Sequence, residues 1–226
     1  MSLIFVTFAD DNFTDKQEAL SNAIKQSGHL ALNYSYDWVK RTDFYLENKH
    51  ILDQSRGCGY WLWKPYIIKH ALTTKLKEKD ILVYIDCGDI FYNTLDGIDL
   101  KEALELTMEN KDNLFITYHN NNATWTKRDC FAFMDCDSEK YWNASQLEAG
   151  ISFWKDTQQS RNLIDEWIMY CKDDRILTDK PNECGLDNLP GFKDHRHDQS
   201  ILTNLVLKYN LAVDNGYIRK YTFPNA

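Results

Sequence analysis

The strongest constraint on the fold is an apolar run that ends in two acids. Residues 81–85 read Ile-Leu-Val-Tyr-Ile, and Asp86 and Asp89 follow closely. A continuous apolar run is typical of a strand buried on both faces of a parallel sheet, and ligands of open α/β sheets bind beyond the carboxyl ends of such strands. The stretch therefore predicts a central strand that delivers two carboxylates to a ligand site.

Two interpretations of these acids remain open. Gly88 lies between them and permits a tight turn or the close approach of a ligand. The carboxylates of Asp86 and Asp89 could therefore converge on a hard cation, Mn²⁺ or Mg²⁺. Alternatively, they cap a strand-end turn.

Composition excludes several function classes. The 226 residues are 43% hydrophobic and 27% charged, as expected for one soluble globular domain spanning residues 1–226. The formal charge of −8 argues against nucleic acid as a partner. No apolar run is long enough for stable membrane insertion, and six cysteines without a CxxC pair indicate reduced thiols. We therefore expect a cytoplasmic protein.

Strand and helix patterns alternate along the chain, which predicts an α/β fold. The opening strand at residues 3–8 lacks both GxGxxG and GxxxxGK[ST] after it, which argues against a Rossmann dehydrogenase or a P-loop enzyme. Residues 37–54 have no clear period, and residues 175–193 read as a long loop. Further strands are expected at residues 30–36, 114–118 and 146–154, and helices at 14–26, from 64 or 65, at 99–110, after Thr157 and from about 198.

A cationic and aromatic segment precedes the acidic strand. Arg56 and Lys64 flank Tyr60 and two tryptophans, and Pro65 suits a first helical turn. Cations near a helix N-terminus make a phosphate site plausible. The alternative is that the rings are core and both cations are solvated.

Two histidines precede the last helix. His195 and His197 stand one residue apart beside Asp198, where they could ligate a metal or bind a phosphate, although a surface histidine more often does neither. The HxHxDH pattern of dizinc hydrolases is not met, because Gln199 and Ser200 occupy its last two positions. A dizinc hydrolase is therefore disfavoured.

The motifs RGCGYWLWKP, YIDCGD, WTKRD, QLEAG and HRHDQS, in this order after the first strand, resemble sugar-nucleotide-dependent glycosyltransferases of the GT-A type. The resemblance covers most of the chain and is closest to bacterial and viral enzymes that build surface polysaccharides. It implies a single GT-A-like (Rossmann-like) domain with a mostly parallel central sheet flanked by helices. It also implies a UDP- or GDP-sugar donor and a glycan acceptor.

The resemblance also assigns site residues. The family's DxD acids carry a divalent cation that bridges the donor diphosphate; Asp86 matches the first acid, but Gly88 stands in place of the second and Asp89 is one residue late. The cation could be bound by both acids, by Asp86 with a later histidine such as His195, or not be required. The implied donor-binding residues are Phe8, Ala9, Asp10, Arg56, Tyr60, Lys64, Asp86, Cys87, Gly88, His195 and His197.

The reacting centre is expected at Gln146 and Glu148, because the matching strand of the family lines the sugar and acceptor. Strand alternation would place both side chains on one face. Glu148 could act as a base or stabilise positive charge on the sugar. Alternatively, it pairs with Lys127 or Arg128 and is structural.

Two other function classes remain open. A metal-dependent hydrolase of a phosphate or sugar ester would need the same acids, cations and histidines. A carbohydrate-binding module would explain the 14% aromatic content but not that combination of charged groups.

Overall fold

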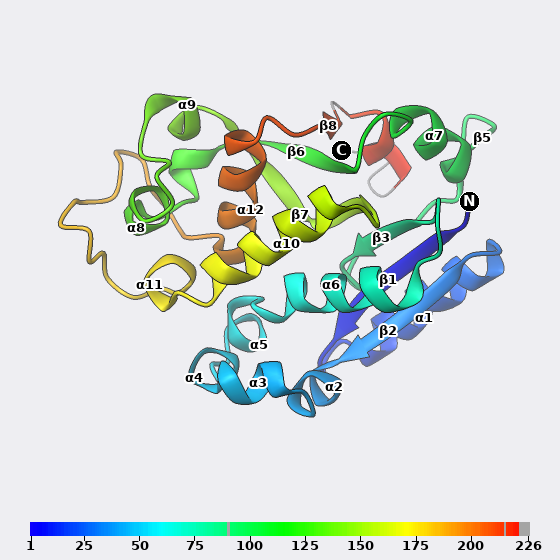
Figure 1. Cartoon of the computed structure of the whole chain (residues 1–226), viewed down its shortest axis with the longest axis horizontal. Coiled ribbons are helices and arrows are strands. Elements are labelled where there is room, and N and C mark those ends of the chain that lie inside the picture. The colour runs from blue at the N-terminus through cyan, green and yellow to red at the C-terminus, as the bar shows by residue number, and fades with distance from the viewer. Residues whose placement is uncertain (90, 215, 222–226) are drawn as a thin grey trace.

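The core of the molecule is a mixed β-sheet. In the part of the chain that this computed structural model describes, residues 1–89, 91–214 and 216–221 without the side chains of 118 and 119, six strands form one sheet. The order is β2-β1-β3-β7-β6-β8 (Figure 1). β7 runs antiparallel to both neighbours, and the other pairs are parallel. The strands are β1 (Leu3–Ala9), β2 (Leu30–Ser35), β3 (Ile81–Ile85), β6 (Asn113–Asn121), β7 (Ser145–Lys155) and β8 (Val213–Asp214), with a separate hairpin of β4 (Thr94–Leu95) and β5 (Ile98–Asp99).

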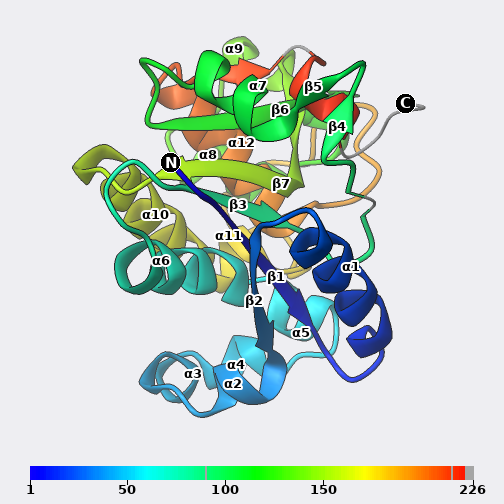
Figure 2. The same ribbon diagram turned by 90° about the vertical axis from the view of Figure 1, so that its right-hand side faces the viewer.

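Helices cover both faces of the sheet. One hydrophobic cluster joins the sheet to α6, α10 and α12, and another joins it to α1, α7 and η2. Figure 2 shows α6 and α10 on the opposite side of β1 and β2 from α1. The helices are α1 (Thr14–Gln26), α2 (Tyr36–Lys40), α3 (Asp43–Glu47), α4 (Lys49–Leu52), α5 (Gly57–Tyr60), α6 (Trp63–Lys75), α7 (Leu100–Thr107), α8 (Arg128–Ala132), α9 (Glu139–Trp142), α10 (Gln158–Cys171), α11 (Asp174–Leu177) and α12 (His197–Lys208), with 3-10 turns η1 (Asn122–Thr124) and η2 (Ile218–Tyr221).

These features confirm the α/β fold with a mostly parallel, helix-covered sheet. β3 is buried along its whole length between β1 and β7, as the apolar run predicts. α10 begins after Thr157, whose hydroxyl accepts a hydrogen bond from the Ser160 amide at 3.2 Å. None of the helices in the described ranges has the length and apolarity needed to cross a bilayer. The assignment of residues 1–226 to a single domain stays a prediction.

The structure decides one segment that the sequence left open and corrects the bounds or burial of three others. The segment without a period contains α2, α3 and α4, helices of only four or five residues, which are too short to show a helical pattern. The predicted loop at 175–193 begins inside α11. β7 extends one residue further at each end than the strand expected at 146–154. The apolar pattern of the helix from about 198 predicts Tyr209 on its core face, but Tyr209 follows the end of α12 and is 48% exposed.

Candidate active site

The ends of β1 and β3 form one cavity, which we call the aromatic cavity. Because these parallel strands are neighbours, their carboxyl ends meet at the same edge of the sheet. The cavity has a volume of about 340 Å³. It is lined by Phe8, Ala9, Asp10, Phe13, Gly57, Cys58, Trp61, Trp63, Asp86, Cys87, Gly88 and Asp89, which include six of the predicted donor-binding residues.

Aromatic rings make this cavity largely apolar. Trp63 stacks on Phe8 with ring centroids 3.6 Å apart, and its Nε1–H donates to the carbonyl of Gly57 at 2.9 Å. The expectation that these rings are core holds for Trp63, which is 4% exposed. Trp61 is only half-buried and borders the space. Such a slot suits a flat, partly apolar group.

A left-handed turn supports the rings. All five residues from 57 to 61 have positive φ, including Cys58 at 52° and Trp61 at 59°. Glycine relieves this strain at two positions: a Cβ on Gly57 would lie 2.5 Å from the Trp61 ring, and one on Gly59 would lie 2.5 Å from the Cα of Leu52. Strained backbone of this kind is concentrated at functional sites. The turn fixes Trp61 at the edge of the cavity.

Two carboxylates converge at the deep end of the cavity. A Cβ built on Gly150 of β7 would lie 3.2 Å from Oδ2 of Asp86 and 3.3 Å from Oδ2 of Asp89. The Tyr84 hydroxyl donates to Asp86 Oδ1 at 2.5 Å, whereas Oδ2 of Asp89 is buried and has no hydrogen-bond partner in the part of the chain that the structure describes. Burial, then the nearby Asp86 and Glu148, raise the pKa of Asp89 to about 7.

The donor set at this position fits a divalent cation held jointly with a ligand. Among the described residues, no group of three or more His, Cys, Asp or Glu side chains is placed to hold a metal. Mg²⁺ commonly takes one or two carboxylates and completes its shell with waters and substrate phosphates. Asp86 and the unpartnered oxygen of Asp89 meet that requirement. His195 does not join them, so the set of Asp86, Asp89 and His195 is not assembled.

A second cavity, which we call the charged cavity, adjoins the first at Trp61 and Asp86. Its volume is about 210 Å³. It is lined by Arg56, Trp61, Lys64, Asp86, Ala149, Gly150, Arg196, His197, Asp198 and Gln199.

Lys64 is a buried cation of this cavity. The alternative that its side chain is solvated is therefore wrong. The Lys64 side chain is 3% exposed, and its Nζ lies 3.2 Å from Asp198 and 3.6 Å from Asp86. Burial alone would lower the pKa of Lys64, but attraction to the two acids outweighs it and raises the pKa. Burial raises the pKa of Asp198 to about 6. Near pH 7 the ammonium and the Asp198 carboxylate therefore form a buried ion pair.

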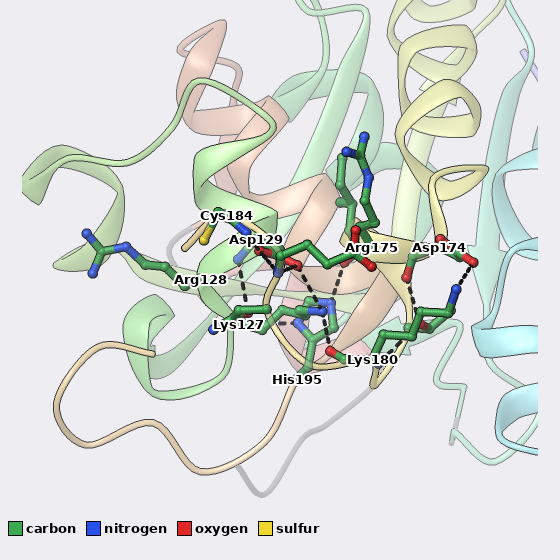
Figure 3. Close-up of polar contacts among 12 residues, drawn as sticks. Lys127, Arg128, Asp129, Asp174, Arg175, Lys180, Cys184 and His195 are labelled. Atoms are coloured by element: carbon green, nitrogen blue, oxygen red, sulfur yellow. Dashed lines mark hydrogen bonds and ion pairs between the residues drawn. The ribbon is translucent and has the colours of Figure 1, made fainter. Parts of the chain in front are cut away.

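Arg56 is held by the segment between α11 and α12. Its guanidinium donates to Asp179 at 2.9 Å and to Asp194 at 2.8 Å. The segment is anchored to the fully buried Asp129, which accepts backbone N–H groups of Glu183 and Cys184 at 2.9–3.0 Å (Figure 3). Asp129 therefore has a structural role.

The two histidines have different roles. Both ring nitrogens of His195 bond to the backbone, one to the carbonyl of Ile176 at 2.8 Å and the other to the amide of Lys127 at 3.3 Å (Figure 3). His195 is thus structural, which corrects its assignment to the donor and metal sites. His197 lines the charged cavity and packs on Tyr60, with ring centroids 4.8 Å apart. Tyr60 is buried and borders neither cavity.

Gln146 and Glu148 do not share an environment. Pairing between β6 and β7 is irregular at this end, so simple alternation fails. Gln146 is 1% exposed, donates to Ser200 at 3.1 Å and accepts from Gln199 at 2.9 Å, so it is structural. Glu148 instead pairs with Arg219 of η2 at 3.5 Å, rather than with Lys127 or Arg128.

Glu148 remains close to the acids. Its charge contributes to the raised pKa of Asp89, so the two carboxylates influence each other. Burial raises the pKa of Glu148 itself, against the opposite effect of Arg219. A half-buried carboxyl of this kind can accept a proton.

Comparison with solved structures identifies the fold. A glycosyltransferase involved in glycosylation of the major capsid of PBCV-1 aligns at a TM-score of 0.50 and 9% identity over 96% of this chain and 84% of that one. Mouse xyloside xylosyltransferase 1 aligns at 0.51 and 8% over 95% and 84%. The bifunctional glycosyltransferase WbbM aligns at 0.52 and 13% over 99% of this chain but only 42% of its own length. The chain has a glycosyltransferase fold.

No protein-family model matches the sequence, and no curated protein matches it either. At sequence identities of 8–13%, the similarity to these structures is visible in the strand topology and in the order of the short motifs rather than in the sequence as a whole. Sequence reasoning missed the residues whose position depends on distant packing. These are Phe13, Gly150, Asp179, Asp194, Arg196 and Arg219; for Gly150, a glycine directly before the apolar end of QLEAGISF was an available signal.

Proposed function

We propose that the chain is a glycosyltransferase that moves a sugar from a nucleoside-diphosphate sugar to a hydroxyl of a glycan acceptor in polysaccharide biosynthesis. The observation that carries this proposal is the pair of adjoining cavities that meet at Asp86 and Trp61. One is aromatic and the other charged, which matches the two unlike ends of a sugar nucleotide. Their place at the carboxyl ends of the strands in a glycosyltransferase fold supports it.

The two cavities suggest how the donor lies. The base and ribose of a UDP- or GDP-sugar enter the aromatic cavity beside Phe8 and Trp61. The diphosphate lies over Asp86 and Asp89, and the sugar enters the charged cavity. There Asp198 and Gln199 offer oxygens to hydroxyl groups.

Asp86 and Asp89 would hold a Mn²⁺ or Mg²⁺ ion, which would supply positive charge beside the diphosphate. When bound, the ion neutralises charge on the departing nucleoside diphosphate. It would also lower the pKa of Asp89, because a cation favours the ionised carboxyl. The Lys64 ammonium helps to hold the Asp86 carboxylate in place through its 3.6 Å contact.

Transfer forms a bond between the acceptor oxygen and the anomeric carbon, while the bond from that carbon to the phosphate oxygen breaks. Glu148 is the base in this proposal and takes the proton of the acceptor hydroxyl. Its raised pKa makes it a better proton acceptor than an exposed carboxylate. Arg219 holds the carboxyl in position at 3.5 Å.

Thiol protection tests the donor site without requiring turnover. Cys58 and Cys87 line the aromatic cavity, whereas Cys184 lies in the segment anchored by Asp129. UDP or GDP with Mn²⁺ should slow alkylation of Cys58 and Cys87, measured by mass spectrometry, and leave Cys184 unchanged. Equal rates with and without both nucleotides would refute the assignment of this cavity.

Product analysis separates the three function classes. A transferase consumes the nucleotide sugar fastest when acceptor is present, whereas the rate of a hydrolase does not depend on acceptor. A binding module consumes neither the nucleotide sugar nor the acceptor. Consumption that does not depend on acceptor would favour the metal-dependent hydrolase. We also propose a cytoplasmic location, which the six free thiols support.

A further inference from the structure

Arg196 is distinguished from the other cations of the charged cavity by its lack of an acidic partner. Lys64 is neutralised by Asp198 and Asp86, and Arg56 by two acids of the α11–α12 segment. Within the described residues, the guanidinium of Arg196 has no carboxylate partner and lies over the Trp125 ring at 4.4 Å. Among the described residues, Arg196 is thus a cation of this cavity that is left without an acid pair.

Trp125 holds the Arg196 guanidinium in an orientation that suits a planar ligand. The indole faces the guanidinium, and the Arg196 backbone N–H also donates to the carbonyl of Trp125 at 3.0 Å. Stacking on a ring restricts a guanidinium and leaves its edge of parallel N–H donors for another group. A carboxylate matches that edge with two parallel hydrogen bonds.

His197 provides a second, independent sign of a ligand in the same cavity. The side chain is 1% exposed, and its Nδ1 pairs with the carbonyl of Leu177 at 2.7 Å. Its Nε2 is buried without a hydrogen-bond partner among the described residues. A buried polar atom of this kind is usually satisfied, and a sugar hydroxyl could donate to it.

We propose that the charged cavity binds a sugar that carries a carboxylate, and that Arg196 receives this carboxylate through two parallel N–H···O bonds. The inference rests on the proposed function, because it places a sugar in this cavity. The carboxylate belongs either to the transferred sugar or to the acceptor, and the experiment below distinguishes these sources.

The donor arm compares UDP-glucuronic acid with UDP-glucose, and GDP-mannuronic acid with GDP-mannose. Each pair differs only at C6. By calorimetry, the wild-type chain should bind the acidic member of one pair about tenfold more tightly. Arg196→Gln should lose this preference and keep its affinity for UDP or GDP alone, and Arg196→Lys should keep part of the preference. Lys193→Gln is the matched control, because Lys193 also faces Trp125, at 5.8 Å, but does not line the cavity.

The acceptor arm compares methyl glucuronide with methyl glucoside in the presence of saturating UDP or GDP and Mn²⁺. A preference for the acid here, lost in Arg196→Gln, places the carboxylate on the acceptor. No preference in either arm, or a preference that survives in Arg196→Gln, would overturn the inference. A loss of affinity for UDP or GDP alone in Arg196→Gln would overturn it too, because Arg196 would then bind the diphosphate. A wild-type chain that binds neither nucleotide would overturn both this inference and the proposed function.

Discussion

The two cavities share Trp61 and Asp86 but are built by different means. The aromatic cavity is made of stacked rings and a strained backbone turn, and its size and shape decide what enters. The charged cavity is made of ion pairs that connect residues far apart in sequence, such as Arg56 with Asp194. The first is sensitive to volume and backbone geometry, and the second to charge.

Because of this difference, we expect substitutions in the two cavities to affect different quantities: folding stability in one case, and ligand binding and turnover in the other. Changes in the turn that supports the rings should act on the folding free energy, because the strain there is relieved only by glycine. Changes among the acids should act on binding and turnover, because those groups have oxygens left for a ligand. Substitutions at single positions can show whether stability and activity respond separately.

Gly59→Ala should produce the largest effect. The substituted residue would retain φ near 90°, and its Cβ would lie 2.5 Å from the Cα of Leu52. We expect the free energy of unfolding to fall by about 3 kcal/mol, roughly 1 from the left-handed backbone and about 2 from overlap. Urea denaturation measures the change.

Gly28→Ala is the matched control for this substitution. Gly28 also has a positive φ, 83°, but nothing lies within 4 Å of an added Cβ. The loss there should be only about 1 kcal/mol. Equal losses at both positions would show that close packing against Leu52 does not contribute.

Glu148→Gln should lower turnover by a factor on the order of 10² or more while the melting temperature and donor affinity are retained. The amide keeps the shape of the side chain but cannot take a proton at neutral pH. Gln146→Ala is the contrasting change, since Gln146 is buried in a hydrogen-bond network and its loss should lower stability. If Glu148→Gln turned over at the wild-type rate, Asp198 of the charged cavity would be the next candidate for the base.

Asp86→Asn should remove the gain in UDP or GDP affinity that Mn²⁺ provides, which we expect to be about tenfold in the wild-type chain. Calorimetry with Mn²⁺ and with chelator gives the comparison directly. Asp10→Asn serves as control, because it removes a carboxylate from the same cavity that is not one of the two that converge beside Gly150. Equal affinity in metal and chelator for the wild-type chain would contradict the cation proposal.

His195 should produce the smallest effect, through pH. Burial lowers the pKa of His195 well below its ordinary value, so the folded chain resists a proton that the unfolded chain takes up. Its contribution to stability is present above pH 6.5 and is lost as the pH falls, by at most about 1.4 kcal/mol per pH unit. The His195→Gln variant cannot titrate there and should show a flatter decline between pH 7 and 5; an unchanged slope would exclude His195 as the source.

Much of the site was predictable because it follows from strands that the sequence displays. Asp10 and Asp86 come directly after β1 and β3, and adjacent parallel strands bring such residues together without further information. The longer helices were predictable as well, because an apolar repeat of 3.6 residues becomes visible when a helix extends over about ten residues or more. Short helices between residues 36 and 52 have too few residues to show a period.

The partners of the charged groups were not predictable from the sequence. The alternative to a catalytic role for Glu148 was a pair with Lys127 or Arg128, but its cation is Arg219, which lies 71 residues further along the chain. His195 and His197 look equivalent in sequence, yet backbone contacts occupy both ring nitrogens of His195, whereas Nε2 of His197 has no hydrogen-bond partner among the described residues.

The sequence by itself therefore determined the strands, the helices and the acids at one edge of the sheet, because these depend on neighbours a few residues away. Only the tertiary structure decided which acid meets which cation, and which histidine lines a cavity. Those outcomes depend on the packing of segments that lie more than 100 residues apart, such as Arg56 against Asp179 and Asp194.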